Sequence, residues 1–260
     1  MNIEVVDKQD NKTSFILSGT SFPFVNTIRR IIMEEVPTMA IEEVEFRSNT
    51  SVLYDEIVAH RLGLTPLTTD LKSYELPDKC KCEGAGCSRC QLKLTLKFKG
   101  DIVYASELES KDPAVKPVYP ETPITSLQKG QKIELEATAV LGRGKDHAKF
   151  SPGHVFYKYK PEIEIGNVKD ADAVINSCPD SIFEKKGGKL TVNEKKLLRP
   201  ILCQKCLQAD PAIKLKESDK EFVFYMEGWG QLSNKEILST AAKIFQGKLD
   251  DFSDKLKALR

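Results

Sequence analysis

The stretch from residue 21 to residue 41 reads SFPFVNTIRRIIMEEVPTMAI and decides the fold. Its large apolar side chains recur at spacings of three and four, the period of one face of an α-helix. These side chains belong to Phe24, Ile28, Ile31 and Ile32. Pro23 is accepted in the first turn of a helix, and the residue before Pro37 avoids helical geometry. We therefore expect an amphipathic helix over Phe24–Glu35, followed by a strand at 41–46.

Runs typical of β-strands lie on both sides of this helix. They are found at 2–7, 13–18, 156–165 and 222–228. Between them, residues 48–155 contain short β-like runs separated by turn-rich stretches, and residues 168–212 form a compact, cysteine-bearing segment. We interpret the chain as an α+β protein. One unit consists of residues 1–47, 156–167 and 213–260, and the other two segments are insertions into it.

The stretch Ser233–Leu259 predicts one long helix. Its apolar residues recur at alternating spacings of three and four, which is a heptad-like seam. The seam consists of Leu238, Ala241 or Ala242, Phe245, Leu249, Phe252, Leu256 and Leu259. Such a helix packs either on its own domain or on a partner chain, and the pattern alone leaves both interpretations open.

Four cysteines crowd into the stretch CKCEGAGCSRC at 80–90. They are Cys80, Cys82, Cys87 and Cys90. Zinc binds four thiolates in a tetrahedron, and a site with four protein ligands has no open position for catalysis. The spacing therefore predicts a structural zinc site, with an iron–sulfur cluster or four free thiols as the alternatives.

The remaining three cysteines form a weaker pattern. They are Cys178, Cys203 and Cys206. The segment RPILCQKCLQADP at 199–211 is similar to the ferredoxin motif C-x2-C-x2-C-x3-C-P, but Pro200 and Asp210 stand at two ligand positions. Three thiolates suit a 3Fe–4S cluster, whereas a 4Fe–4S cluster needs a further ligand. The alternative is a ferredoxin-like fold that has lost its cluster and keeps its cysteines in the core.

Composition and motifs narrow the possible functions of the 260-residue chain. Its 39 basic and 38 acidic residues leave a net charge of +1, so we expect no strong direct nucleic-acid binding. This also argues against a zinc-dependent nucleic-acid adaptor. The sequence has no long apolar run and no signal peptide, so we expect a cytoplasmic protein without membrane contact. None of the three histidines, His60, His147 and His154, has a nucleophile in a known pattern, and we expect His60, followed by Arg61, to order a loop and not to transfer protons.

Several stretches together resemble one protein family. The stretch FPFVNTIRRIIMEEVPTMAIEEVEF resembles the assembly helix and next strand of the α-like subunits of DNA-directed RNA polymerase. NTSVLYDEIVAHRLGLTPL (49–67) and HAKFSP (147–152) resemble signatures of the archaeal and eukaryotic members. The four-cysteine cluster stands where the eukaryotic third-largest subunit binds zinc. Residues 168–212 are similar to the ferredoxin-like insertion of the archaeal members of this α-like family.

This resemblance implies a discontinuous dimerisation domain with a β-rich and a ferredoxin-like insertion. It implies a non-catalytic assembly subunit within the polymerase, a nucleotidyltransferase (EC 2.7.7.6) whose catalytic aspartates lie on the largest subunit. The implied partners are the small α-like subunit L, the small subunits N and P, and the large catalytic subunits. The expected partner interface consists of Phe24, Ile28, Ile31, Ile32, Leu238, Phe245, Leu249, Phe252 and Leu256. The alternative function is that of a ferredoxin-like redox protein.

Overall fold

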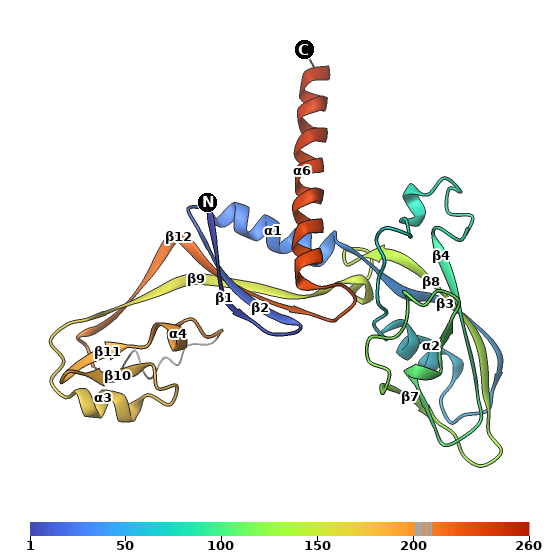
Figure 1. Ribbon diagram of the computed structural model, residues 1–260, viewed down its shortest axis with the longest axis horizontal. Coiled ribbons are helices and arrows are strands. Elements are labelled where there is room, and N and C mark those ends of the chain that lie inside the picture. Colours follow the sequence, from blue (N-terminus) through green and yellow to red (C-terminus); the bar gives the residue numbers. More distant parts are fainter. Residues whose placement is uncertain (201–204, 206–207, 209, 260) are drawn as a thin grey trace. The chain divides into compact units, whose positions relative to one another are not determined.

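The computed structural model describes residues 1–200, 205, 208 and 210–259. Its contacts divide the chain into two compact units, and both are discontinuous in sequence. One unit comprises Met1–Thr27 and Val155–Met226, and the other comprises Ile28–His154 and Glu227–Arg260. Helices and strands occur in both units, which confirms the α+β class (Figure 1). The finer division into three domains stays a prediction.

The first unit is built on a four-stranded sheet with the order β1-β2-β12-β9 (Figure 1). These strands are β1 (Asn2–Lys8), β2 (Lys12–Ser18), β12 (Ile213–Gly228) and β9 (Gly153–Ile165). Aromatic rings pack between neighbouring strands, since Phe15 stacks on Phe224 with 5.0 Å between ring centroids. Phe22, the first residue of α1 (Phe22–Glu34), meets Tyr157 edge to face at 6.0 Å. The strands at the two ends of the chain therefore share one aromatic layer.

A small α/β module lies between β9 and β12 in the sequence. It contains α3 (Ala171–Ser177), β10 (Phe183–Lys186), β11 (Lys189–Val192) and α4 (Glu194–Leu197). Asp170 and Asn193 cap the two helices, because their side chains accept hydrogen bonds from backbone N–H groups of the first turns. The buried residues of its core are Val174, Cys178, Ile182, Phe183, Leu197 and Ile213. The module thus has an apolar core of its own.

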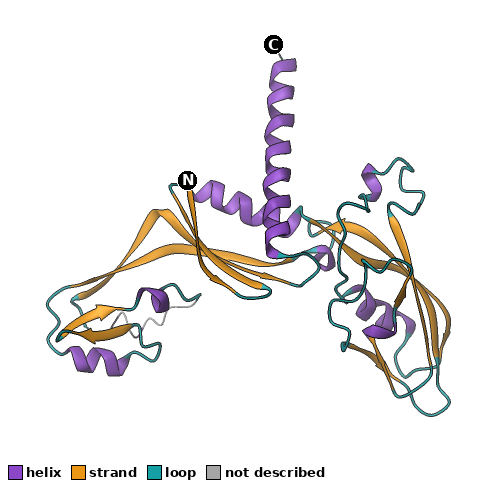
Figure 2. Cartoon of the chain, in the orientation of Figure 1, coloured by secondary structure: helices purple, strands orange, loops and turns teal. Residues whose placement is uncertain are grey.

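The second unit contains an antiparallel sheet with the order β3-β8-β4-β6. Its strands are β3 (Pro37–Asn49), β8 (Ile133–Arg143), β4 (Gln91–Phe98) and β6 (Glu109–Ser110). Figure 2 draws the strands in orange. Alternate residues of β8 are buried, as expected for a sheet with one covered face. A separate pair of strands consists of β5 (Ile102–Tyr104) and β7 (Pro123–Ser126), and short 3₁₀ turns lie at Pro77–Lys79, Ala105–Glu107 and Ala148–Phe150.

The helix α2 (Asp55–Gly63), which contains His60, corrects one expectation, because the sequence indicated β-like runs and turns in this region and no helix. Only Val58 and Leu62, one turn apart, are buried in α2, where they join the apolar core beneath the sheet. One buried pair in nine residues does not produce a helical period that can be distinguished from a short β-like run. The helix was therefore not evident from the sequence.

The HAKFSP segment at 147–152 forms hydrogen bonds and an ion pair with β3. The register between β3 and β8 shifts between Ile41 and Glu43, as in a β-bulge. There the Lys149 ammonium group donates a hydrogen bond of 2.9 Å to the Ile41 carbonyl and forms an ion pair with Glu42. The buried hydroxyl of Thr38 donates to the Phe150 carbonyl at 2.8 Å. This signature thus contributes to the internal packing of the second unit.

The longest helix is α6 (Asn234–Ala258), which has 25 residues. It begins with a capping box, in which Ser233 accepts a hydrogen bond from the backbone of Glu236 and the Glu236 side chain accepts one from the backbone of Ser233. The observed bounds confirm the helix predicted over Ser233–Leu259 to within one residue at each end. Among the described residues, no helix is both long and apolar enough to cross a membrane.

Candidate metal centre and partner surface

The four clustered cysteines bring their sulfur atoms together in one place. All four Sγ atoms lie within 4.8 Å of one another. Cys82 Sγ lies 3.5 Å from Cys80 Sγ and 3.4 Å from Cys90 Sγ. Cys87 Sγ lies 3.5 Å from Cys80 Sγ and 3.9 Å from Cys90 Sγ. The structure therefore places the predicted ligands as one compact group.

These separations fit one tetrahedral metal ion. A tetrahedron with metal–sulfur bonds of about 2.3 Å has edges of about 3.8 Å, close to the observed sulfur–sulfur distances. A disulfide would require about 2.05 Å, and all four residues are free thiols. An iron–sulfur cluster distributes its cysteine ligands over more than one iron ion, which calls for a wider arrangement. The sulfur set therefore fits a single zinc ion best.

The backbone of the loop makes this arrangement possible. Gly84 and Gly86 have φ values of +84° and +86°, in the left-handed region that favours glycine. The chain can therefore reverse direction between Cys82 and Cys87. The Cys87 N–H donates to Cys90 Sγ at 3.2 Å, a contact that stabilises negative charge on the sulfur. The pKa of the Cys82 thiol is lowered to about 6, chiefly by its contact with the Cys90 thiol, whereas burial raises the pKa of the Cys90 thiol.

The loop is anchored to the second unit on both sides. The 3₁₀ turn Pro77–Lys79 precedes it, and β4 begins immediately after Cys90. The Glu75 N–H donates to the Arg89 carbonyl at 2.8 Å, and the side chains of these two residues form an ion pair. A metal ion in this place would join the two arms of the loop and hold the end of β4.

Of the other three cysteines, the structure describes one, Cys178. Cys178 is buried in the core of the small module, where its sulfur accepts a hydrogen bond from the Ile182 N–H at 3.4 Å. Cys203 and Cys206 lie outside the described residues, as does most of the segment that is similar to a ferredoxin motif. Pro200 and Asp210, which stand at the other two ligand positions of that segment, are among the described residues. The predicted iron–sulfur site is therefore untested and stays a prediction.

The residues predicted to contact a partner differ in exposure. Ile31 and Ile32 of α1 are buried within this chain, while Phe24, Ile28, Leu238 and Phe245 are half-buried. Farther along α6 the seam is open to solvent, with 47% of Leu249, 61% of Phe252 and 48% of Leu256 exposed. The buried residues of α6 are Asn234, Ile237 and Ala241, all in its first turns. The apolar stripe therefore continues well beyond the part of the helix that this chain covers.

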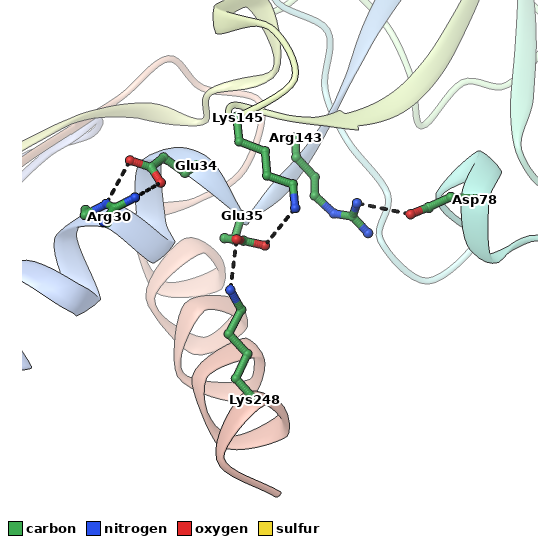
Figure 3. A network of polar contacts seen from close by, with 7 residues as sticks. All are labelled: Arg30, Glu34, Glu35, Asp78, Arg143, Lys145 and Lys248. Carbon is green, nitrogen blue, oxygen red and sulfur yellow. Dashed lines mark hydrogen bonds and ion pairs between the residues drawn. The ribbon is translucent and has the colours of Figure 1, made fainter. Parts of the chain in front are cut away.

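A network of ion pairs ties α6 to the rest of the second unit (Figure 3). The Glu35 carboxylate accepts a hydrogen bond from Lys248 of α6 at 2.9 Å and lies 3.7 Å from the Lys145 ammonium group. Burial opposes the charge on Glu35, but the two lysines outweigh it and the net effect lowers the pKa of this carboxyl group. Nearby, Arg143 pairs with Asp78 at 3.1 Å. Sequence reasoning missed this network, because Glu35 and Lys248 are 213 positions apart and no local pattern links them.

Comparisons with known proteins agree with this architecture. Residues 41–154 match the family described as the RNA polymerase Rpb3/RpoA insert domain. The chain is 39% identical to the DNA-directed RNA polymerase subunit Rpo3 of Methanosphaera stadtmanae, over 96% of this chain and 97% of the relative. It is also 39% identical to the Rpo3 of Methanothermobacter thermautotrophicus, with the same coverage, and 35% identical to that of Pyrococcus furiosus over 100% of this chain and 98% of the relative. Since the similarity spans nearly the full length, the chain belongs to the Rpo3 family of DNA-directed RNA polymerase subunits, which are α-like subunits related to Rpb3 and RpoA.

Proposed function

We propose that this chain is a non-catalytic assembly subunit of a cytoplasmic RNA polymerase. In this role it pairs with the small α-like subunit L. The pair, together with the small subunits N and P, forms the platform on which the large catalytic subunits gather. Membership of the Rpo3 family favours this function over that of a ferredoxin-like redox protein. The structural observation that carries the proposal is the exposed seam of α6.

The exposed seam is the part of the chain best suited to a partner helix. Leu249, Phe252 and Leu256 lie at spacings of three and four on one side of α6, and solvent reaches about half of each. Burying one such side chain fully contributes about 1.5–3 kcal/mol. A heptad-like spacing favours a second helix as the cover, because side chains at positions a and d fit between those of a partner helix. On the same helix, the half-buried Leu238 and Phe245 continue the seam toward the first turns.

The substitution Phe252→Asp tests the seam directly. It puts a charge in the proposed interface, so we expect the affinity for subunit L to fall by about 2–4 kcal/mol. The matched control is Asp254→Lys, which changes the charge two residues farther along, about 200° around the helix. The measurement is the dissociation constant of the purified pair. Binding of Phe252→Asp as tight as that of the wild type would exclude the seam as the interface.

We further propose that Cys80, Cys82, Cys87 and Cys90 bind one structural zinc ion. The near-tetrahedral sulfur set supports this assignment. The ion would clamp the loop at 80–90 and leave no position for a substrate. Metal analysis of the full chain, purified anaerobically, should give one zinc per chain. Cys82→Ser should lose it, while Cys178→Ser should keep it. Iron in place of zinc at this loop would contradict the assignment.

The same metal analysis bears on the second predicted cofactor. Iron in wild-type chain that disappears in Cys178→Ser would support a 3Fe–4S or 4Fe–4S cluster on Cys178, Cys203 and Cys206. Absence of iron after anaerobic purification favours a degenerate motif, broken at Pro200 and Asp210. The zinc content serves as the internal control, because it depends on a different set of cysteines.

A further inference from the structure

A groove of about 670 Å³ lies within the second unit, between α6 and the segment that leads into the four-cysteine loop. Its apolar lining comes from Leu71, Tyr74, Leu76, Leu141 and Ile244. The volume lies within the range of about 300–1,000 Å³ that is usual for binding clefts. Nothing in the proposed pairing through the α6 seam makes use of this groove.

The groove and the seam lie on different sides of α6. Thr240, Gly247 and Asp251 line the groove, and each stands two residues after a seam position. Two residues correspond to about 200° of rotation around an α-helix. A partner helix on Leu249 and Phe252 therefore leaves the groove open. The helix thus has two separate surfaces, of which the first was predicted from the sequence and the second was not.

The charges around the groove favour an acidic ligand. The ion-pair network of Figure 3 occupies Glu35, Arg143 and Lys248, all of which line the groove. Two further lining carboxylates are also engaged, because Glu75 pairs with Arg89 and Asp251 pairs with Lys255.

Two charged residues in the lining of the groove form none of these ion pairs. Lys79 and Lys243 are exposed, and neither forms an ion pair with any residue that the structure describes. The groove therefore combines an apolar lining with two available cations on its rim.

Gly247 gives the α6 wall of the groove a bare stretch of helix backbone. A Cβ atom added there would meet nothing within 4 Å, so the fold of this chain does not require glycine at this position. An exposed glycine inside a helix lowers helix stability relative to almost any other residue except proline. What glycine does provide is room for another chain to approach the helix closely.

From the groove we infer a second docking surface. It binds a short acidic peptide segment with a large apolar side chain, contributed by a polymerase subunit other than the one that covers the α6 seam. The apolar side chain enters between Leu76 and Ile244, and carboxylates on either side of it meet Lys79 and Lys243. The inference rests on the proposed assembly function only for the origin of this segment.

Photo-crosslinking in the reconstituted polymerase identifies the occupant. The photoreactive residue p-benzoylphenylalanine is placed at position 240 in the groove or at position 252 in the seam, each in the full chain. We expect position 240 to crosslink to an acidic segment of one subunit and position 252 to a different subunit. Crosslinks from position 240 to nucleic acid, to a second copy of this chain or to the subunit reached from position 252 would each overturn the inference. So would the absence of a crosslink at position 240. Failure at position 252 alone would instead contradict the proposed seam.

Substitutions at Gly247 separate docking from folding. Gly247→Leu should raise the melting temperature of the chain, because it improves helix propensity without a clash. It should nevertheless weaken binding of the crosslinked subunit at least tenfold, because its side chain enters the groove. Gly247→Ala serves as the control, since it raises helix propensity with little added volume. The double charge reversal Lys79→Glu with Lys243→Glu should weaken binding by a similar factor. Unchanged binding in Gly247→Leu would refute the inference.

Discussion

The helices α1 and α6 carry similar apolar patterns but bury them differently. In α1, which has 13 residues, Val25 and Ile32 are inaccessible to solvent and Ile31 is nearly so. In α6, no residue after Ala241 is fully buried among those described, although its apolar spacing continues to Leu256 and beyond. The difference teaches that periodicity shows which side of a helix is apolar, whereas the surrounding chain decides whether that side is already covered.

The chain segments around each helix account for the contrast. The last turn of α1 leads into β3 within three residues, and the Glu34 carbonyl accepts a hydrogen bond from the Lys145 N–H at 3.0 Å. A Cβ at Gly144 would collide with the Met33 carbonyl, so the turn after β8 approaches the helix closely. By contrast, the only ion pair between α6 and a residue outside this helix, among the described residues, is the one from Lys248 to Glu35. Beyond it, solvent reaches the apolar side of the helix.

The largest expected effect on stability is a difference between two truncations, one on each helix. Ile32→Ala should lower the free energy of unfolding by about 2–5 kcal/mol, because it leaves a cavity in a closed core. Leu249→Ala, at a site that is 47% exposed, should stay within about 0.5 kcal/mol of wild type. Urea denaturation of the purified full chain measures both. If the two variants lost similar stability, α6 would be covered by its own chain and the contrast would fail.

The sequence predicted features that depend on the local chain and missed those that depend on distant segments, which is the same contrast as that between the two helices. The helices at Phe24–Glu35 and Ser233–Leu259 were predicted closely, because long apolar periods and prolines carry local information. The strands predicted at 41–46 and 222–228 exist but extend over Pro37–Asn49 and Ile213–Gly228. The close spacing of Cys80, Cys82, Cys87 and Cys90 likewise predicted a group that the structure brings together. The burial of Ile32 by this chain and the exposure of Phe252 were not predictable, because both depend on segments that are distant in sequence. For the same reason, neither the groove nor the contact between Glu35 and Lys248 was predicted.

A smaller effect is expected at the start of α6. Ser233→Ala removes the side-chain half of the capping box and should cost about 1 kcal/mol of stability. Ser239→Ala, at a position within the same helix, is the matched control and should change stability by less than about 0.5 kcal/mol. Denaturation curves and hydrogen exchange in the first turns of α6 provide the measurements. Equal effects of the two substitutions would mean that the buried residues of the first turns alone stabilise the start of the helix, without a contribution from the cap.

The smallest effect concerns the ion pair that marks the limit between the covered and the open part of α6. The pKa of Glu35 is lowered in the folded chain, because Lys248 and Lys145 outweigh the opposing effect of burial. A carboxyl group of this kind stabilises the fold above its unfolded pKa near 4.5, and the contribution disappears as pH falls through the folded pKa. Glu35→Gln should therefore cost up to about 1 kcal/mol at neutral pH.

At a pH low enough to protonate Glu35 in the folded chain, the difference between Glu35→Gln and wild type should vanish. Lys248→Met tests the same contact from α6 and should lose its effect over the same pH range. A double variant should cost less than the sum of the two single ones, because both remove one shared interaction. A pH-independent loss in Glu35→Gln would show that the side chain acts through packing. The boundary between the two parts of α6 would then be set by Ile237 and Ala241 alone.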